Sequence, residues 1–374
     1  MTTGRWKFRA VAGLVAGLWI ASAAQAQLVI GQTAGFTGAV SAGVKETTEG
    51  AKLYFDSVNA RGGVNGQLIE LVSLDDKFDP KLAEANARQL ITQNKVLALF
   101  LTRGTPHTQA IVPVLAEHHV ALVGPSTGAM ALHKPVNPYI FNVRSSYQRE
   151  AERAIKHLSL IGLTRIAVLQ VDDSFGADVA IGANAGFTSV GKQPVIVEKF
   201  DRNKPDFSAI APRVAKTDPQ AVLFIGSGQM VADGLDALRA AGSRAQLVTM
   251  SNNASGGFIK QLGSNAHGTI VTQVFPYERS VATPIIKEAL GLASAQGQAT
   301  ISPAMMEGFA AAKVMVEGLK RAGPKPTREK IIAALNSMQK FDLGGMELSY
   351  SATDHSGLDF VDLSIIGPDG RFRR

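Results

Sequence analysis

Two short corners of the sequence hold the residues whose types and spacing could do chemistry. Residues 97–101 form an apolar run that ends in Thr102-Arg103-Gly104-Thr105, and residues 120–123 form another that ends in Gly124-Pro125-Ser126-Thr127-Gly128. We predict both runs to be strands of a parallel sheet, in which ligands bind beyond the carboxyl ends of the strands. The hydroxyl groups, together with the free N–H groups of the next helix, can hold a carboxylate without a buried cation.

The second corner also allows a catalytic interpretation, because residues 124–128 match the G-x-S-x-G pattern of a nucleophile elbow. Ser126 would then be the nucleophile of a secreted serine esterase or hydrolase, with His267 or the pair Asp354-His355 as its partners. Such short patterns arise easily where a strand turns into a helix, and the later histidines form no consistent triad, so we favour binding. A structural turn without any ligand is the third interpretation.

The elements that must position these corners form one long alternating series. From Gln27 onward, short apolar runs alternate with longer amphipathic stretches, which is the pattern of βα units on parallel sheets. Predicted strands at 166–171, 221–225 and 247–250 each end in a polar corner. These three corners are residues 172–176, 226–228 and 251–253. The sequence therefore predicts an α/β fold with several strand ends that carry polar groups.

Length and composition limit the classes of protein that fit. A chain of 374 residues with 45% hydrophobic residues has room for about two globular domains. The absence of cysteine excludes disulfides and thiolate chemistry. The sequence has no G-x-G-x-x-G, Walker A, H-E-x-x-H or calcium-loop spacing, so we expect no cofactor and no metal.

The N-terminus predicts export. Arg5, Lys7 and Arg9 precede the apolar run 10–23, which ends in Ala24-Gln25-Ala26, a small-residue cleavage site. The run is shorter than the roughly 20 residues of a membrane-spanning helix. We predict a signal peptide at 1–26, and its removal would lower the formal charge from +7 to +4. The remaining basic residues are scattered, so we expect a periplasmic protein that binds no nucleic acid.

Several segments, in order along the chain, resemble the leucine/isoleucine/valine-binding proteins of ABC transporters. The resemblance implies a type I periplasmic binding protein, with two Rossmann-like lobes joined by a three-stranded hinge and a ligand held in the cleft. It also implies a membrane permease as partner, and we expect a monomer. The segments are Thr37-Gly38, Gly50-Ala51, Asn59-Ala60-Arg61-Gly62-Gly63-Val64, Asp75-Asp76, Asp79-Pro80, Gly124-Pro125-Ser126 and Leu238-Arg239-Ala240-Ala241-Gly242.

The resemblance further implies a set of ligand-binding residues on both lobes. The first corner contributes a hydroxyl, the second contributes hydroxyl and backbone groups, and an aromatic residue forms a wall on the second lobe. The family's tyrosine and its amine-binding glutamate fall on residues of this sequence that carry no charge, and a family threonine is replaced by glycine. The corresponding residues here are Thr105, Ser126, Thr127, Gly128, Phe175, Ser227, Ser251 and Asn252.

The absence of the amine-binding glutamate changes which ligand we expect, because a buried ammonium without a counter-charge is energetically costly. The resemblance implies a branched-chain amino acid or a related small carboxylate. Since Ser251 and Asn252 stand at the amine position and Arg103 adds a cation, we expect an organic acid without an α-amine, such as an aromatic or 2-oxo acid. Asp172 or Asp173 could restore the charge, and a conventional amino-acid binder with a shifted amine site is the alternative.

The implied crossings divide the mature chain into two discontinuous lobes. We predict lobe one at residues 27–143 plus 274–345 and lobe two at residues 144–273 plus 346–374. Binding would then work by hinge closure, in which a ligand that bridges both lobes favours the closed form.

Overall fold

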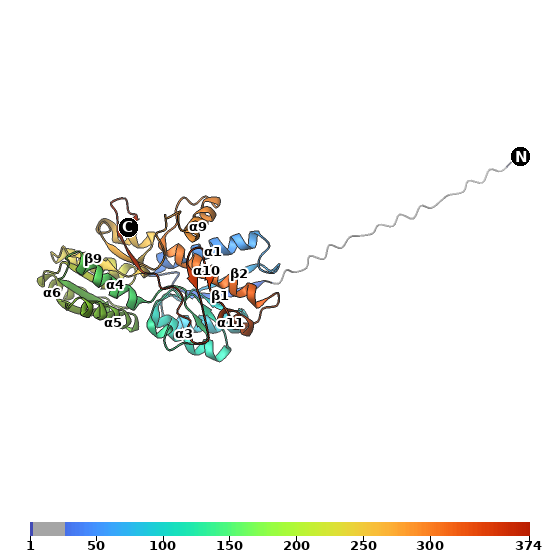
Figure 1. Ribbon diagram of the computed structural model, residues 1–374, viewed down its shortest axis with the longest axis horizontal. Helices are drawn as coiled ribbons and strands as arrows, with labels where there is room; N and C mark the ends of the chain where they lie inside the picture. The colour runs from blue at the N-terminus through green and yellow to red at the C-terminus, as the bar shows by residue number, and fades with distance from the viewer. Residues whose placement is uncertain (3–26) are drawn as a thin grey trace.

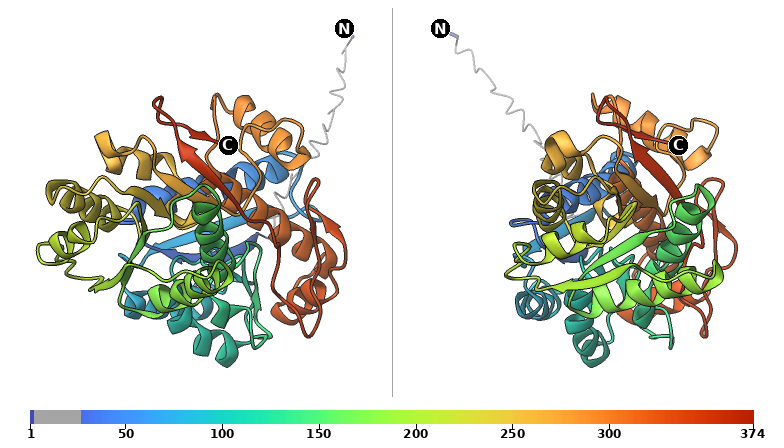
Figure 2. Two further views of the ribbon diagram at one scale, coloured as in Figure 1. Left: turned by 60° about the vertical axis from the view of Figure 1, so that its left-hand side comes forward. Right: turned by 90° about the vertical axis from the view of Figure 1, so that its left-hand side faces the viewer.

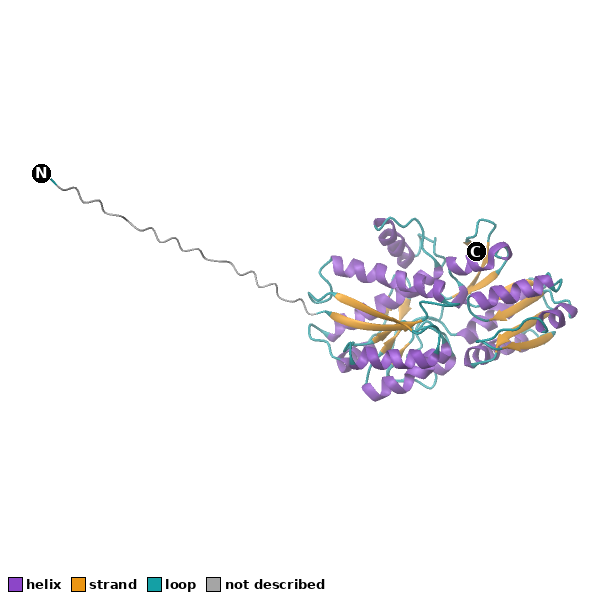
Figure 3. Ribbon diagram, turned by 180° about the vertical axis from the view of Figure 1, so that it is seen from behind, coloured by secondary structure: helices purple, strands orange, loops and turns teal. Residues whose placement is uncertain are grey.

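The computed structural model describes residues 1–2 and 27–374, and almost all of the predicted signal peptide lies outside them. The molecule consists of two lobes side by side (Figure 1). Each lobe is built on its own β-sheet with helices on both faces (Figure 3). The predicted α/β class with parallel sheets is confirmed.

The first lobe contains a five-stranded parallel sheet in the order β2-β1-β3-β4-β5. Its strands β3 and β4 are only two residues long, because the chain leaves the sheet early to form the two polar corners. The strands are β1 (Leu28–Ala34), β2 (Ile69–Asp75), β3 (Leu99–Phe100), β4 (Leu122–Val123) and β5 (Ile140–Phe141).

Successive residues of these strands point to opposite faces of the sheet, and both faces are covered by helices. Phe100 and Val123 pack in a core with α1 and α10, whereas Leu99 and Leu122 pack in a separate core with α2 and α3. Burial on both faces explains the uninterrupted apolar runs of the sequence. The helices are α1 (Ser41–Ala60), α2 (Pro80–Thr92), α3 (Thr105–His118), α9 (Pro284–Ala295), α10 (Pro303–Ala322) and α11 (Arg328–Asn336).

The second lobe contains a seven-stranded sheet in the order β14-β13-β10-β9-β8-β6-β7. Strands β6 to β10 are parallel, and β13 and β14, red in Figure 2, add to one edge as antiparallel strands. The strands are β6 (Ile166–Val171), β7 (Ile196–Phe200), β8 (Ala221–Ile225), β9 (Gln246–Thr249), β10 (Ile270–Gln273), β13 (Asp362–Ile366) and β14 (Phe372–Arg373).

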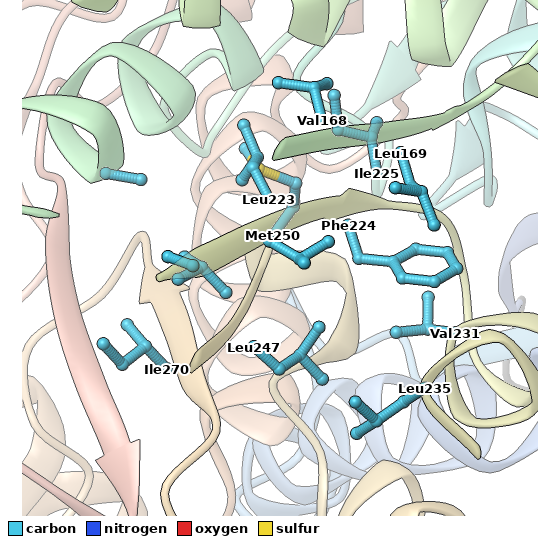
Figure 4. Packing of buried hydrophobic residues seen from close by; sticks show 14 of the residues in the cluster. Val168, Leu169, Leu223, Phe224, Ile225, Val231, Leu235, Leu247, Met250 and Ile270 are labelled. Atoms are coloured by element: carbon cyan, nitrogen blue, oxygen red, sulfur yellow. The ribbon is translucent and has the colours of Figure 1, made fainter. Parts of the chain in front are cut away.

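One hydrophobic core joins this sheet to its helices. Side chains of the central strands, among them Phe224 and Leu247, meet Val231 and Leu235 of α7 (Figure 4). The rigid packing of the central strands fixes where their carboxyl ends, and hence the polar corners, lie. The helices are α4 (Tyr147–Leu160), α5 (Ser174–Ser189), α6 (Ile210–Lys216), α7 (Gln229–Ala240) and α8 (Gly256–Leu262).

The chain passes between the sheets three times, after β5, after β10 and before β13. A small hairpin of β11 (Phe341–Asp342) and β12 (Glu347–Leu348) precedes the last passage. Leu348, Tyr350 and Leu358 pack in the first-lobe core, although the predicted bounds placed residues 346–358 in the second lobe. Short strand-like runs in the sequence do not reveal which of two cores they join, which explains the difference.

Candidate ligand site between the lobes

The two corners that follow β3 and β4 lie against each other in the first lobe. Arg103 and Ser126 form a parallel β-bridge, and the Ser126 N–H donates to the Thr102 carbonyl over 2.7 Å. The hydroxyl groups of Thr105 and Thr127 are joined over 2.7 Å. The structure therefore brings together Thr105, Ser126 and Thr127, and it adds Arg103 to them.

The corners after β8 and β9 meet in the second lobe in a similar way. The Asn252 side-chain amide donates to the Ser227 hydroxyl over 2.9 Å and to the Gly226 carbonyl over 3.1 Å. Ser251 and Asn252 are part of a short 3-10 helix at residues 251–253, and all of these polar side chains are buried. The predicted second-lobe residues Ser227 and Asn252 are thus neighbours.

Arg103 links the two sets of corners across the cleft. Its Nη1 donates to Ser126 Oγ over 3.0 Å, and its Nη2 donates to the backbone carbonyl of Asn252 over 2.6 Å. Only 5% of Arg103 is exposed. A long side chain from lobe one therefore binds the backbone of lobe two, so the structure shows the cleft closed.

Two of the candidate residues play packing roles beside this site. The Gly128 carbonyl accepts from the Tyr147 N–H over 2.7 Å, and a Cβ at Gly128 would lie 2.6 Å from the Ser145 carbonyl oxygen. Phe175 is in the second-lobe core and packs edge-on against Tyr147, with ring centroids 4.9 Å apart. Tyr147 in turn lies beneath the Arg144 guanidinium, 4.5 Å from the ring centroid. The aromatic ring next to Arg144 is therefore that of Tyr147, and Phe175 packs behind it.

Ser251 belongs to a buried ionic cluster at the first crossing. Arg144 Nη2 donates to Ser251 Oγ over 2.7 Å and also binds Glu150, while the Ser251 N–H donates to Glu150 Oε2 over 3.0 Å. Glu307 Oε1 lies 3.7 Å from Arg144 Nη1. Burial raises the pKa of Glu150. Burial also works to lower the pKa of Arg144, but electrostatic attraction to Glu150, Tyr147 and Glu307 and the hydrogen bond to Glu150 together outweigh it, and the pKa lies above its usual value.

This cluster is what sequence reasoning missed. Arg144 lies three residues after the end of β5, and that position at a predicted crossing was the one signal available for it. Glu150 and Glu307 lie on α4 and α10 and show no pattern that separates them from other helical glutamates. Only the packing of the lobes brings the three charges together.

The aspartates considered as substitutes for the missing glutamate are engaged elsewhere. Asp172 pairs with Lys199 over 2.9 Å at the surface. Asp173 caps the start of α5 through the N–H of Phe175, and its other oxygen binds Arg202 over 2.5 Å. Both carboxylates are thus already paired with basic side chains, so the structure gives no support to their role as the amine counter-charge.

Several buried polar atoms near the crossing have no hydrogen-bond partner within the part of the chain that the structure describes. They are Asn252 Oδ1, Ser145 Oγ, Arg144 Nη1 and Glu307 Oε1. Since buried polar groups are nearly always paired in folded proteins, these four atoms have unused capacity to bind water or a ligand. Two narrow gaps border Arg103, with free volumes of only about 0 and 10 Å³, so the closed cleft is tightly packed around the guanidinium. The first reaches Thr47 of α1, and the second reaches Gly228 and Asn252.

Contacts away from the arginine also close the cleft. Glu46 of α1 accepts hydrogen bonds from the N–H groups of Gly256 and Gly257, which begin α8 in the other lobe. On another side, Arg202 of lobe two lies 5.0 Å above the ring of Phe78 in lobe one. Because their partners lie in different lobes, these contacts exist only when the lobes are together.

A catalytic triad is not assembled around Ser126. His355 is bound to the carbonyls of residues 137 and 140 and to Asn336, and His267 is exposed on the second lobe. The only side-chain partner of the Ser126 hydroxyl within the described residues is Arg103. A guanidinium donates protons and cannot accept one from a nucleophile, so the predicted esterase geometry is absent from this site.

Two α/β lobes with polar corners facing each other across a closed cleft define a binding protein that encloses its ligand. Residues 27–359 match the sequence model of the family described as periplasmic binding protein, and the chain belongs to this family. Within the described residues, no three His, Cys, Asp or Glu side chains gather as metal ligands, and no helix is long and apolar enough to cross a membrane.

Known relatives extend over nearly the whole chain. A Leu/Ile/Val-binding protein of Rhizobium johnstonii is 25% identical over 349 residues, which covers 91% of this chain and 92% of that protein. The crystal structure of a substrate-binding periplasmic protein from Ralstonia solanacearum has a TM-score of 0.84 and 31% identity, and covers 92% of this chain and 99% of that one. A Thermus thermophilus branched-chain amino acid ABC transporter structure with bound valine shares the fold, with a TM-score of 0.81 and 20% identity over 93% of this chain and 95% of that one.

Proposed function

We propose that this protein captures a small organic carboxylate in the cleft between its lobes and delivers it to the permease of an ABC transporter. The observation that carries the proposal is the bridge from Ser126 through Arg103 to the Asn252 carbonyl. This bridge places a cation and hydroxyl groups of one lobe against the other lobe, where an enclosed carboxylate would contact both. The Leu/Ile/Val-binding relatives support a ligand with a carboxylate.

The predicted binding residues take complementary roles in this proposal. The hydroxyls of Thr105 and Thr127 are bonded to each other and can turn to donate to a ligand oxygen instead. The Arg103 guanidinium can donate to the ligand carboxylate while it still donates to the Ser126 hydroxyl. Ser227 and Asn252 offer the opposite wall, and Tyr147, backed by Phe175, offers an aromatic surface. Gly128 and Ser251 fix the first crossing next to the site. None of these roles requires bond making, so the protein acts by binding and not by catalysis.

We further propose that the protein is exported to the periplasm and acts there as a monomer. The sequence features of residues 1–26 support a cleaved signal, and the family is periplasmic by its description. Protein isolated from a periplasmic extract should therefore begin at Gln27.

The test is identification of the small molecule that the purified protein carries. Native mass spectrometry of protein from the periplasm should show an added mass that denaturation releases as an organic carboxylate. Thr127→Val keeps the side-chain shape but removes the hydroxyl bonded to Thr105, and should reduce the occupancy. Unoccupied protein that also fails to bind any member of a carboxylate panel by calorimetry would contradict the proposal.

A further inference from the structure

We infer that Arg103 determines the class of ligand, so that the cleft selects a monocarboxylate without an ammonium group over the amino acid of the same shape. This inference rests on the proposed function, because it assigns the chemistry of the same cleft. It goes further in naming the residue that discriminates and in predicting which of two matched ligands binds.

The first step is the environment of the Arg103 guanidinium. It is buried, and its hydrogen-bond acceptors are one hydroxyl, Ser126 Oγ, and one backbone carbonyl, that of Asn252. No carboxylate in the described part of the chain forms an ion pair with it within 4.0 Å. Burial lowers the pKa of Arg103, yet a guanidinium stays protonated at any physiological pH. Arg103 is therefore a buried cation without a counter-ion.

The second step is the state of the neighbouring charges. Glu150 and Glu307 both face Arg144, and Asp173 binds Arg202, so each nearby carboxylate already has a guanidinium partner. The charge of Glu307 attracts Arg103, whereas the charges of Arg144 and Arg202 repel it. Three arginines and three carboxylates therefore lie close together, but Glu150 and Glu307 share Arg144, so Arg103 is the one guanidinium of the three without a carboxylate in contact among the described residues.

A buried guanidinium without a carboxylate in contact treats the two kinds of ligand differently. A carboxylate that lies on Arg103 makes a charge-assisted, two-point contact and supplies the partner that this guanidinium lacks. A zwitterionic amino acid makes the same contact, but it also brings an ammonium into a site where Ser251 and Asn252 supply no charge and the nearby carboxylates are paired. Because a buried ammonium without a carboxylate is strongly unfavourable, the zwitterion loses affinity relative to the simple acid.

The same contact couples selection to closure. Since Arg103 belongs to lobe one and reaches the Asn252 backbone of lobe two, an anion on the guanidinium lies at the junction of the lobes. The free acceptor Asn252 Oδ1 at that junction can take a neutral hydroxyl of the ligand. A hydroxy acid can therefore donate to this acceptor, whereas an oxo acid has no donor for it and would bind through its carboxylate alone.

The test compares ligands that differ only at the α-carbon. Calorimetry with leucine, 4-methyl-2-oxopentanoate and 2-hydroxy-4-methylpentanoate, with benzoate as an aromatic acid, ranks the ligand class on the unmodified protein. We expect the acids without an amine to bind at least about tenfold more tightly than leucine. Arg103→Gln should weaken the binding of these acids by about 100-fold and remove the preference, whereas Arg103→Lys should keep part of it. Arg149→Gln, an exposed arginine paired with Asp359, is the control and should change nothing.

Each outcome decides the matter. Tight leucine binding without measurable binding of the acids would overturn the inference while leaving the proposed function intact. Unchanged acid affinity in a folded Arg103→Gln protein would overturn it as well. If no member of the panel binds, the copurified molecule is identified instead. A copurified molecule with an ammonium group would contradict the inference, and a carboxylate without an amine would support it. A protein that binds no small molecule at all would defeat the proposed function itself.

Discussion

Glu46 and Gly257 are joined across the two lobes, with the Glu46 Oε1 atom accepting the Gly257 N–H over 2.7 Å. The second carboxylate oxygen accepts the Gly256 N–H over 3.0 Å, so one side chain of α1 binds the beginning of α8. Both N–H groups would face water in an open cleft. The carboxylate therefore stabilises the closed form without belonging to the ligand-binding corners.

Glu46→Gln should weaken ligand binding by about tenfold, because an amide accepts these hydrogen bonds less strongly and carries no charge. The loss should come mainly from faster dissociation, which stopped-flow fluorescence or surface plasmon resonance can measure. Glu49→Gln on the same helix is the matched control, since Glu49 is exposed. Equal effects of the two substitutions would argue against a specific closing contact.

Gly228 should be needed for closure. A Cβ at this position would lie 2.0 Å from the Ala39 carbonyl oxygen of the other lobe, and the backbone has φ of 56°. Gly228→Ala should therefore reduce ligand affinity by more than about tenfold, because the lobes cannot approach fully. Gly242→Ala separates this effect from backbone strain, since Gly242 also has a positive φ, of 87°, but meets nothing within 4 Å. A comparable loss of affinity in both variants would contradict the explanation.

Glu150 should contribute strongly to folding stability. It is fully buried and binds Arg144, the Ser251 N–H and Thr272. Glu150→Gln leaves the Arg144 charge without its closest partner and should lower the free energy of unfolding by about 3–5 kcal/mol in chemical denaturation. Glu152→Gln, which removes an exposed pair with Lys156 on the same helix, should cost less than about 1 kcal/mol.

Asp76 should make stability depend on pH in the acid range. Burial raises the pKa of Asp76 to about 6, against hydrogen bonds from the Phe78 N–H and the Thr33 hydroxyl. A raised pKa means that the folded chain holds the proton more tightly than the unfolded chain, so the contribution of Asp76 is greatest at low pH and is lost as the pH rises through about 6. We therefore expect the free energy of unfolding of Asp76→Asn to rise relative to that of the unmodified protein between about pH 4 and pH 7, as measured by chemical denaturation. A constant difference between the two proteins over that range would show that Asp76 does not titrate as described.

The sequence predicted the elements whose local signals are strong. Helix α3 has such signals at both ends, because a glycine with φ of 93° precedes Thr105 and a left-handed residue, His119, follows His118. Strands β6 and β8 have their predicted bounds. Strand β3 is shorter than the apolar run at 97–101, because Leu101 has a positive φ and turns the chain out of the sheet. Apolar character alone does not show where such a turn begins.

The sequence predicted those residues of the candidate site that come directly after the ends of strands. Ser126 and Thr127 could be nominated because parallel sheets place such corners at one edge, whereas Ser227 and Asn252 were implied by the resemblance to the leucine/isoleucine/valine-binding proteins. The contacts of Arg103 with Asn252 depend on how one lobe meets the other, and no local pattern encodes that arrangement. For the same reason the pairing of Glu307 with Arg144, which removes a carboxylate from the cleft, was beyond sequence reasoning.

Closure of the two lobes around a ligand is the central claim, and the distance between labels on the two lobes tests it most directly. The chain contains no cysteine, so Lys81→Cys and Lys204→Cys can be spin-labelled selectively; both positions are exposed and lie within three residues of Phe78 and Arg202, which contact each other between the lobes. Pulsed electron resonance should show longer distances in the protein stripped of ligand, and a single shorter distance after saturation with the copurified carboxylate. An identical distance distribution in the two states would contradict the account.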